Sequence, residues 1–223
     1  MHFRPHDRDS AETMIKKKYE LIILDCDGTL VDSEPLSNRV IAEMLTEIGI
    51  PMSAKQAFDR FAGTSMSQII SYIETKKGRL DFDFEERFRS LTKVVFEKEL
   101  KPIPGVEDFI QALSTPYCVA SNGPKRKMAI TLKVTGLSRY FADEHIFSAY
   151  DIQEWKPSPA LFLHAAQNMG HSPDKCLVIE DTSAGAEAAI AAGMDLLLYD
   201  PHDEPQLEQY QRFKDYRFLK GVH

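Results

Sequence analysis

Three short aliphatic runs, at 21–24, 117–120 and 176–179, each lead directly into polar residues: Asp25 and Asp27, Ser121 and Asn122, and Glu180 and Asp181. A short, continuous apolar run is typical of a strand buried on both faces. Helical patterns of about ten residues separate the later runs, and strands that alternate with such helices form βαβ units. The sequence therefore predicts an α/β core with a Rossmann-like parallel sheet.

A long helical segment interrupts this alternation after the first run. Between residues 35 and 100, four stretches carry apolar residues at helical spacing, and the first of them ends at Gly49. We predict an all-α insertion at 35–100, an α/β core formed by 19–34 and 101–223, and an N-terminal extension at 1–18. The Pro-containing stretches at 31–36 and 100–105 are the expected hinge.

Composition limits the class of partner and the compartment. The chain of 223 residues has a formal net charge of -7, which argues against nucleic acid or an anionic membrane as its main partner. Its three cysteines have no paired spacing and lie in or beside apolar runs, so we expect buried, reduced thiols. No apolar run is long enough to span a bilayer, and residues 1–18 lack the apolar region of a secretory signal. We expect a cytoplasmic protein.

The polar residues after the strands are expected to meet. In open parallel sheets, ligands bind beyond the carboxyl ends of the strands. Lys156 should join that edge, because it follows a stretch at 145–152 that we predict to be a short strand. Each motif alone is ordinary, as an acidic turn, a helix start or a surface lysine. Their occurrence together, each beyond a strand, favours a functional site.

The charges of this edge indicate its chemistry. Two like charges about 4 Å apart repel by roughly 4 kcal/mol at an effective dielectric of 20, so four carboxylates there require positive charge. Hard oxygen ligands suit Mg²⁺, and Lys156 would add a second cation. Ser121 and the amides of the following helix could bind an anion. Such a set, around a carboxylate nucleophile, is typical of phosphoryl transfer.

The motifs "DCDGTLVD", "VASNG", "WKPSP" and "VIEDTSAG" resemble those of the haloacid dehalogenase superfamily over residues 20 to about 200. By this resemblance, Asp25 is the nucleophile that becomes an aspartyl phosphate, and Asp27 is the acid and base. Ser121 and Lys156 hold the transferring phosphoryl group. The implied Mg²⁺ ligands are Asp25, the Asp27 carbonyl and Asp181, with Glu180 binding directly or through water. The resemblance also implies that residues 36–100 are a helical cap that excludes water.

Individual residues distinguish the activities within this superfamily. Asp27 is present, which favours phosphoryl transfer over dehalogenation. The chain also resembles β-phosphoglucomutase, but Ser37 and Met66 stand where that mutase has a catalytic His and a phosphate-binding Arg. Other stretches look closest to bacterial sugar-phosphate phosphatases, including those acting on 6-phosphogluconate. A hexose phosphomutase and an inactive binding module are the alternatives; the second would be expected to lose Asp25, Asp27 or Lys156.

The expected ligand is a small phosphate ester, bound by a protein that we expect to be monomeric. Six residues are candidates for substrate binding: Glu34, Ser37, Gly63, Thr64, Asn122 and Lys125. Lys125 belongs to a run of three cations at a helix start, where positive charge opposes the helix dipole.

Overall fold

The computed structural model describes residues 19–61 and 64–219, so the predicted N-terminal extension and Gly63 lie outside the described residues. The chain divides into two compact units. Unit 1 holds the residues up to Val31 and those from Pro102, and unit 2 is Asp32–Lys101.

Unit 1 is a parallel sheet of six strands in the order β3-β2-β1-β4-β5-β6. The strands are β1 (Leu21–Leu24), β2 (Tyr117–Ser121), β3 (Ile146–Ser148), β4 (Cys176–Glu180), β5 (Asp195–Tyr199) and β6 (Arg212–Phe213). All five neighbouring pairs run parallel. Every residue of β1 is buried, as its position between β2 and β4 requires.

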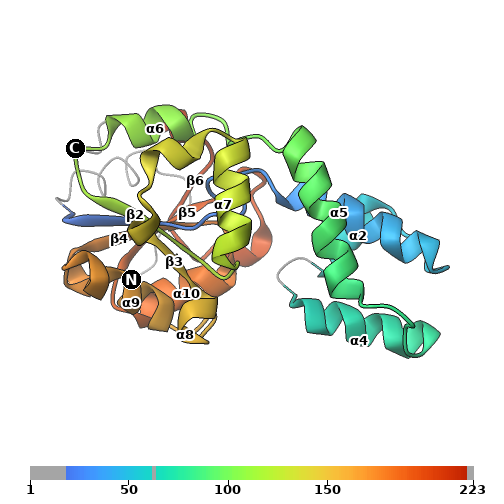
Figure 1. The fold of residues 1–223 in the computed structure, drawn as a ribbon. Helices are drawn as coiled ribbons and strands as arrows, with labels where there is room; N and C mark the ends of the chain where they lie inside the picture. The colour runs from blue at the N-terminus through green and yellow to red at the C-terminus, as the bar shows by residue number, and fades with distance from the viewer. Residues whose placement is uncertain (1–18, 62–63, 220–223) are drawn as a thin grey trace. The chain divides into compact units, whose positions relative to one another are not determined.

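Helices cover both faces of this sheet. Figure 1 shows α6 (Val106–Ala112) and α7 (Lys125–Val134) on one side and α8 (Ala149–Ile152), α9 (Ala160–Met169) and α10 (Ser183–Ala191) on the other. Helices α9 and α10 pack closely on the strands because they present small buried residues such as Ala165, Ala166 and Ala189. The predicted α/β fold with a parallel sheet is confirmed.

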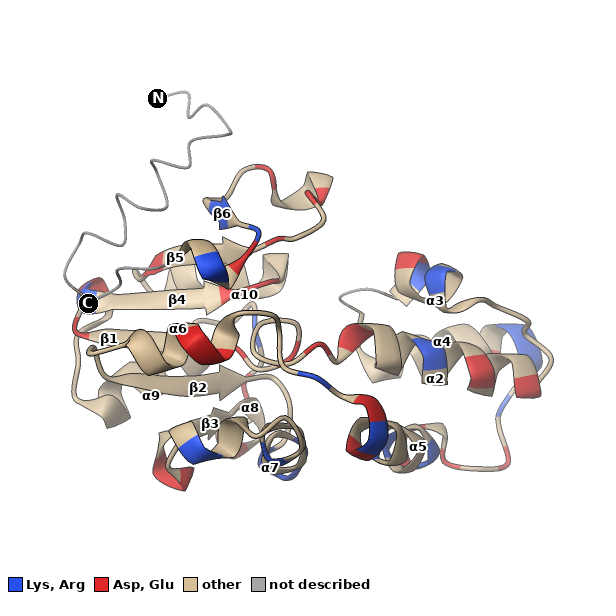
Figure 2. Ribbon diagram, turned by 90° about the horizontal axis from the view of Figure 1, so that it is seen from above, with Lys and Arg blue, Asp and Glu red and all other residues tan. Residues whose placement is uncertain are grey.

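Unit 2 is built from helices alone among its described residues. They are α2 (Glu34–Glu47), α3 (Ala54–Phe61), α4 (Met66–Lys77) and α5 (Phe84–Glu99). Helix α4 starts with a capping box, in which Ser65 and Gln68 bond to each other's backbone N–H. The helices share a separate apolar core, which includes Leu45, Phe61 and Ile73. Figure 2 shows basic and acidic residues interspersed on these helices.

The prediction of a strand over 145–152 is wrong in its second half. Strand β3 ends at Ser148, and α8 follows at once. The buried Ser148 side chain accepts a hydrogen bond from the backbone N–H of Tyr150, which begins the helix. An apolar run of this length can form either element, so the capping bond decides.

The three cysteines are buried and free, as predicted. Within the described residues, no helix has both the length and the apolar character needed to cross a membrane. The predicted hinge stretches are joined by a backbone hydrogen bond of 3.0 Å from Asp32 N to Lys101 O.

Candidate active site

The carboxyl ends of the three central strands lie at one edge of the sheet. Leu24 at the end of β1 is in register with Val119 of β2 and Ile179 of β4. The backbone N–H of Asp25 continues this pairing by donating to the carbonyl of Ile179 at 2.9 Å. The polar residues that follow these strands are therefore brought to the same edge.

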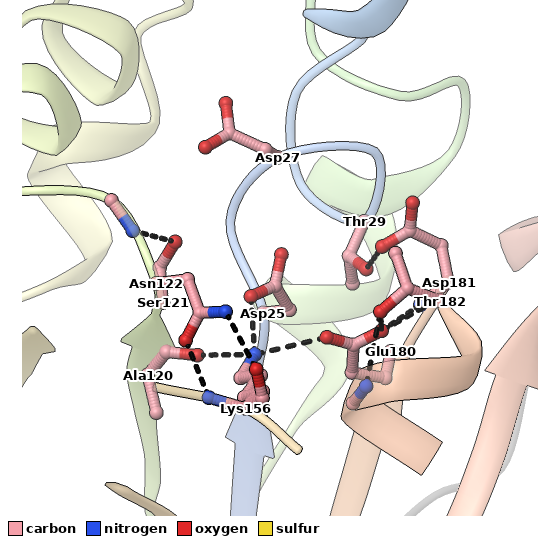
Figure 3. Close-up of polar contacts among 12 residues, drawn as sticks. Asp25, Asp27, Thr29, Ala120, Ser121, Asn122, Lys156, Glu180, Asp181 and Thr182 are labelled. Carbon is pink, nitrogen blue, oxygen red and sulfur yellow. Dashed lines mark hydrogen bonds and ion pairs between the residues drawn. The ribbon is translucent and has the colours of Figure 1, made fainter. Parts of the chain in front are cut away.

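Lys156 lies at the centre of this edge (Figure 3). Its Nζ donates to Asp25 Oδ1 at 2.5 Å, to Glu180 Oε1 at 2.9 Å and to the carbonyl of Ala120 at 3.0 Å. Three acceptors use all three protons of an ammonium group. The Lys156 side chain is only 2% exposed, so the ion pairs stabilise a charge that would otherwise be buried alone.

Glu180 is fixed on its other side by the start of α10. Its Oε2 accepts from the backbone N–H groups of Asp181 and Thr182, at 2.7 and 2.5 Å, and from the Thr182 hydroxyl at 2.8 Å. A carboxylate at a helix N-terminus is favoured by the helix dipole. Gly185 gives it room, since a Cβ there would lie 1.9 Å from Glu180 Cδ. The side chain is thus held facing Lys156.

Three carboxylates form a group that could hold a cation. Ligand oxygens of Asp25, Glu180 and Asp181 all lie within 4.8 Å of one another. The Thr29 hydroxyl donates to Asp181 Oδ1 at 2.9 Å and orients that side chain. The three carboxylates and Lys156 leave two formal negative charges, and hard oxygen donors prefer a cation such as Mg²⁺. The residues therefore fit a divalent ion, and the contacts of Glu180 favour an orienting or water-mediated role for it.

The pKa values of the central pair show the same electrostatic imbalance. Burial and the charge of Glu180, against the opposing effect of Lys156, together raise the pKa of Asp25 to about 7. Burial acts to lower the pKa of Lys156, but Asp25 and Glu180 outweigh it and hold this pKa above its usual value. The lysine therefore stays charged, and a cation that replaced the proton would keep Asp25 ionised.

The residues after β2 form the other side of the edge. Ser121 is 2% exposed, and its Oγ accepts from the backbone N–H of Gly123 at 3.1 Å. The Asn122 amide bonds the backbone of Lys156, with Oδ1 accepting from its N–H at 2.9 Å and Nδ2 donating to its carbonyl at 3.4 Å. These contacts hold the backbone of Lys156 in place, and the role of Asn122 in substrate binding stays a prediction.

Asp27 lies apart from the cluster around Lys156, as Figure 3 shows. Its Oδ2 accepts from Lys127 Nζ at 2.8 Å. Lys125, which we predicted as a substrate contact, pairs with Asp151 at 2.9 Å, and its role in binding stays a prediction. Sequence reasoning did not single out Lys127, because a cation in the first turn of a helix usually faces solvent.

The remaining predicted substrate contacts belong to unit 2. Glu34 and Ser37 lie in the first turn of α2. The Thr64 hydroxyl donates to the carbonyl of Phe61 at 2.8 Å, at the end of α3. Their role in binding stays a prediction.

Known proteins resemble this chain in sequence and in fold. The family model of haloacid dehalogenase-like hydrolases matches residues 22–199. The chain is 38% identical over 192 residues to the 6-phosphogluconate phosphatase of Escherichia coli, covering 84% of this chain and 86% of that protein. Among solved structures, a conserved haloacid dehalogenase-like protein of unknown function from Agrobacterium tumefaciens is 34% identical, with a TM-score of 0.75 over 92% of this chain and 90% of that one.

A second similar solved structure contains bound ligands of its own. A family hydrolase from Deinococcus radiodurans, with bound phosphate and sodium, is 25% identical and has a TM-score of 0.75 over 92% of this chain and 95% of that one. The family model covers most of the chain, including all four motifs that carried the resemblance. The predicted membership is confirmed: this chain belongs to the haloacid dehalogenase-like hydrolases.

Proposed function

We propose that this protein is a Mg²⁺-dependent phosphatase that hydrolyses a small phosphorylated metabolite through an aspartyl phosphate on Asp25. The observation that carries the proposal is the buried ion-pair network of Asp25, Lys156 and Glu180 beside Asp181. A phosphoric monoester hydrolase is also supported by the family match and by a relative that is named a phosphatase.

In the first step, a carboxylate oxygen of Asp25 attacks phosphorus, and the bond from phosphorus to the ester oxygen breaks. Asp27 gives its proton to that oxygen, so the product leaves as an alcohol. Lys156 and Ser121 stabilise the charge on the phosphoryl oxygens. Mg²⁺, held by Asp25, Asp181 and the Asp27 carbonyl, would offset the repulsion between the nucleophile and the phosphate.

In the second step, Asp27 takes a proton from water, and the oxygen of that water attacks phosphorus. The bond between phosphorus and Asp25 breaks, which releases inorganic phosphate and restores both carboxyl groups. Glu180 keeps Lys156 in place during both steps through the contact of 2.9 Å. The two aspartates therefore have separate tasks, as nucleophile and as acid and base.

The proposed substrate class is a sugar phosphate or a sugar-acid phosphate, and 6-phosphogluconate is the first candidate. Its support is the identity of 38% to a 6-phosphogluconate phosphatase. The phosphomutase alternative is disfavoured because Met66, in place of the phosphate-binding Arg, packs against the apolar core of unit 2. We propose that residues 35–100 act as the cap, and that Ser37 and Thr64 in the cap, with Glu34 just before it, supply selectivity. We further propose a monomer in a reducing cytoplasm, consistent with three free thiols.

Phosphate release from a panel of sugar, polyol and sugar-acid phosphates, ranked by kcat/KM with Mg²⁺ present, tests this proposal. Activity should disappear with EDTA and return with added Mg²⁺. Asp25→Asn should lose at least about 10⁴-fold in kcat, because the amide cannot form the aspartyl phosphate.

The matched control is Asp108→Asn, which makes the same chemical change at an exposed position on α6 and should keep full activity. Activity retained in purified Asp25→Asn would contradict the assignment of the nucleophile. Conversion of glucose 1-phosphate to glucose 6-phosphate, with no release of phosphate, would favour the mutase.

A further inference from the structure

The first turn of α7 carries three cations in succession, Lys125, Arg126 and Lys127. Positive charge near a helix N-terminus opposes the helix dipole. Two of these side chains are offset by carboxylates from other parts of unit 1. Lys125 pairs with Asp151 at 2.9 Å and Lys127 pairs with Asp27 at 2.8 Å. The second of these carboxylates is the proposed acid and base.

The pair between Lys127 and Asp27 joins residues 100 positions apart and is partly buried, with side chains 36% and 25% exposed. The pair lies beside the hydroxyl of Ser121, which we propose binds the phosphoryl group. A Cβ at Gly123 would be 3.5 Å from both Asp27 Oδ2 and Ser121 Oγ, and 3.6 Å from Lys127 Cδ. The ammonium, the carboxylate and the serine therefore surround the same glycine.

The backbone of Asp27 is held separately by a tight turn. Gly28 N donates to Val31 O at 2.9 Å, and Leu30 N donates to Cys26 O at 2.9 Å. These bonds fix where the Asp27 side chain starts but not where its carboxylate points. Figure 3 shows that carboxylate directed away from Asp25 and Lys156. The ion pair with Lys127 holds the carboxylate in this direction.

We infer that Lys127 is a positioning residue for proton transfer by Asp27, an inference that rests on the proposed phosphatase function. Lys127 keeps the carboxylate aligned with the ester oxygen, without contact of its own with the substrate. An alkoxide is a poor leaving group and needs a proton as the bond breaks, whereas a nitrophenolate does not. Lys127 should therefore matter for alkyl phosphates far more than for activated aryl phosphates.

The test compares kcat/KM of Lys127→Met on glucose 6-phosphate, 6-phosphogluconate and p-nitrophenyl phosphate. This ratio reports the steps up to release of the alcohol or phenol, so slow hydrolysis of the aspartyl phosphate does not affect it. We expect a loss of roughly 10- to 100-fold on both sugar esters, since general acid catalysis contributes about 10²–10⁴-fold. The loss on p-nitrophenyl phosphate should stay below about 3-fold.

Two further variants separate positioning from stability. Lys127→Arg keeps the cation and should restore most of the alkyl activity, whereas Lys127→Gln should not. Lys133→Met removes an exposed lysine from the last turn of the same helix and should leave all three values unchanged. Thermal unfolding shows whether each variant folds. If Lys127→Met does not fold, the comparison of Lys127→Gln with Lys127→Arg tests the inference.

Equal losses on the alkyl and aryl esters by a folded variant, or no loss at all, would overturn the inference. A loss confined to 6-phosphogluconate would also overturn it, because that ester shares its leaving group type with glucose 6-phosphate and differs by a carboxylate. If the wild-type protein released no phosphate from any of the three esters or from any member of the wider panel, the proposed function itself would fail.

Discussion

Two glycines make room for the acidic side chains of the site. Gly28 has a φ of +80°, and a Cβ there would lie 1.9 Å from Asp181 Oδ2. Gly185 lies inside α10, and a Cβ there would lie 1.9 Å from Glu180 Cδ and 2.0 Å from its Oε1. Both overlaps are with carboxylates that other bonds hold in place. Glycine is therefore required at both positions, at Gly28 for the placement of the Asp181 carboxylate and at Gly185 for that of Glu180.

Gly185→Ala tests this requirement because two effects oppose each other. Alanine in a helix interior is favoured over glycine by about 0.5–1 kcal/mol. The overlap, however, would push Glu180 away from Lys156 and from the donors of α10, and a broken buried ion pair costs about 3–5 kcal/mol. The cost of the overlap should exceed the gain in helix propensity. Gly185→Ala should therefore lower the free energy of unfolding, measured with urea, by about 2–4 kcal/mol. It should also reduce phosphatase activity.

The control for Gly185→Ala is a double-mutant cycle with Glu180→Ala. If the only task of Gly185 is to accommodate Glu180, then Gly185→Ala should be neutral or stabilising in the Glu180→Ala background. Variants of contacting residues are expected to show such non-additivity. A full cost in both backgrounds would mean that another neighbour, and not the carboxylate, excludes a side chain at this position.

At the scale of elements, the site depends on a link between two loops. The loop after β2 bonds the loop before α9 through the Asn122 amide, which contacts both the N–H and the carbonyl of Lys156. Lys156 itself comes from neither a helix nor a strand. The long lysine side chain can reach Asp25 and Glu180 reproducibly only if its backbone is fixed.

Asn122→Ala should therefore reduce catalysis without removing a group that reacts. We expect kcat to fall about 10-fold, since misplacing a catalytic group by about 1 Å can cost 10²-fold. We also expect a loss of about 1–2 kcal/mol in stability from the unpaired backbone N–H. Asn168→Ala, which alters an exposed asparagine on α9, is the matched control and should change neither quantity. An unchanged kcat in Asn122→Ala would show that the loop holds Lys156 without this bond.

Much of this arrangement could be predicted from the sequence, because the chemistry follows the strands. A buried strand in a parallel sheet is recognisable as a short apolar run, and parallel strands end at a common edge. The neighbourhood of Asp25, Ser121 and Glu180 follows from these two rules alone. Helices of unit 2 were recognisable from their apolar stripes and from the glycines that end them.

Other features depended on contacts that no local pattern contains. The end of β3 is set by one capping bond from Ser148 to Tyr150. The partner of Asp27 is Lys127, which lies 100 residues away in a run of similar cations. Which of the three lysine and arginine side chains reaches the carboxylate depends on how α7 is rotated against the sheet. That rotation is set by packing, which periodicity does not specify.

At the scale of the whole molecule, the residues of the predicted metal site all belong to unit 1. Asp25 lies before Val31, and Glu180 and Asp181 lie after Pro102. Unit 2 has an apolar core of its own. A ligand that binds only the folded state stabilises that state in proportion to the logarithm of its concentration. Mg²⁺ should therefore stabilise unit 1 directly, and the effect should depend on the protonation of Asp25.

The size of that effect should vary with pH in a defined direction. Burial, together with Glu180, raises the pKa of Asp25 to about 7, from 3.8 in an unfolded chain. Between these values the metal-free fold holds a proton that the unfolded chain lacks, so its stability falls as the pH rises to 7. Mg²⁺ must displace that proton. At saturating Mg²⁺, the increase in the free energy of unfolding that Mg²⁺ produces should fall by about 1.4 kcal/mol for each pH unit below 7. Above pH 7 this increase should no longer depend on pH.

Thermal unfolding with and without Mg²⁺ at pH 5.5, 6.5 and 8 measures this dependence without reference to activity. Asp181→Asn should weaken the stabilisation but keep its slope with pH, whereas Asp25→Asn should abolish the slope, because the titrating group is gone. A slope retained in Asp25→Asn would assign the proton to another residue.

Hydrogen exchange at a fixed pH shows which part of the chain Mg²⁺ stabilises. Mg²⁺ should slow amide exchange in β1 and β4, while α2 and α5 serve as the internal reference. Equal protection of those helices would mean that the two units open together, since the carboxylate group found among the described residues comes from unit 1.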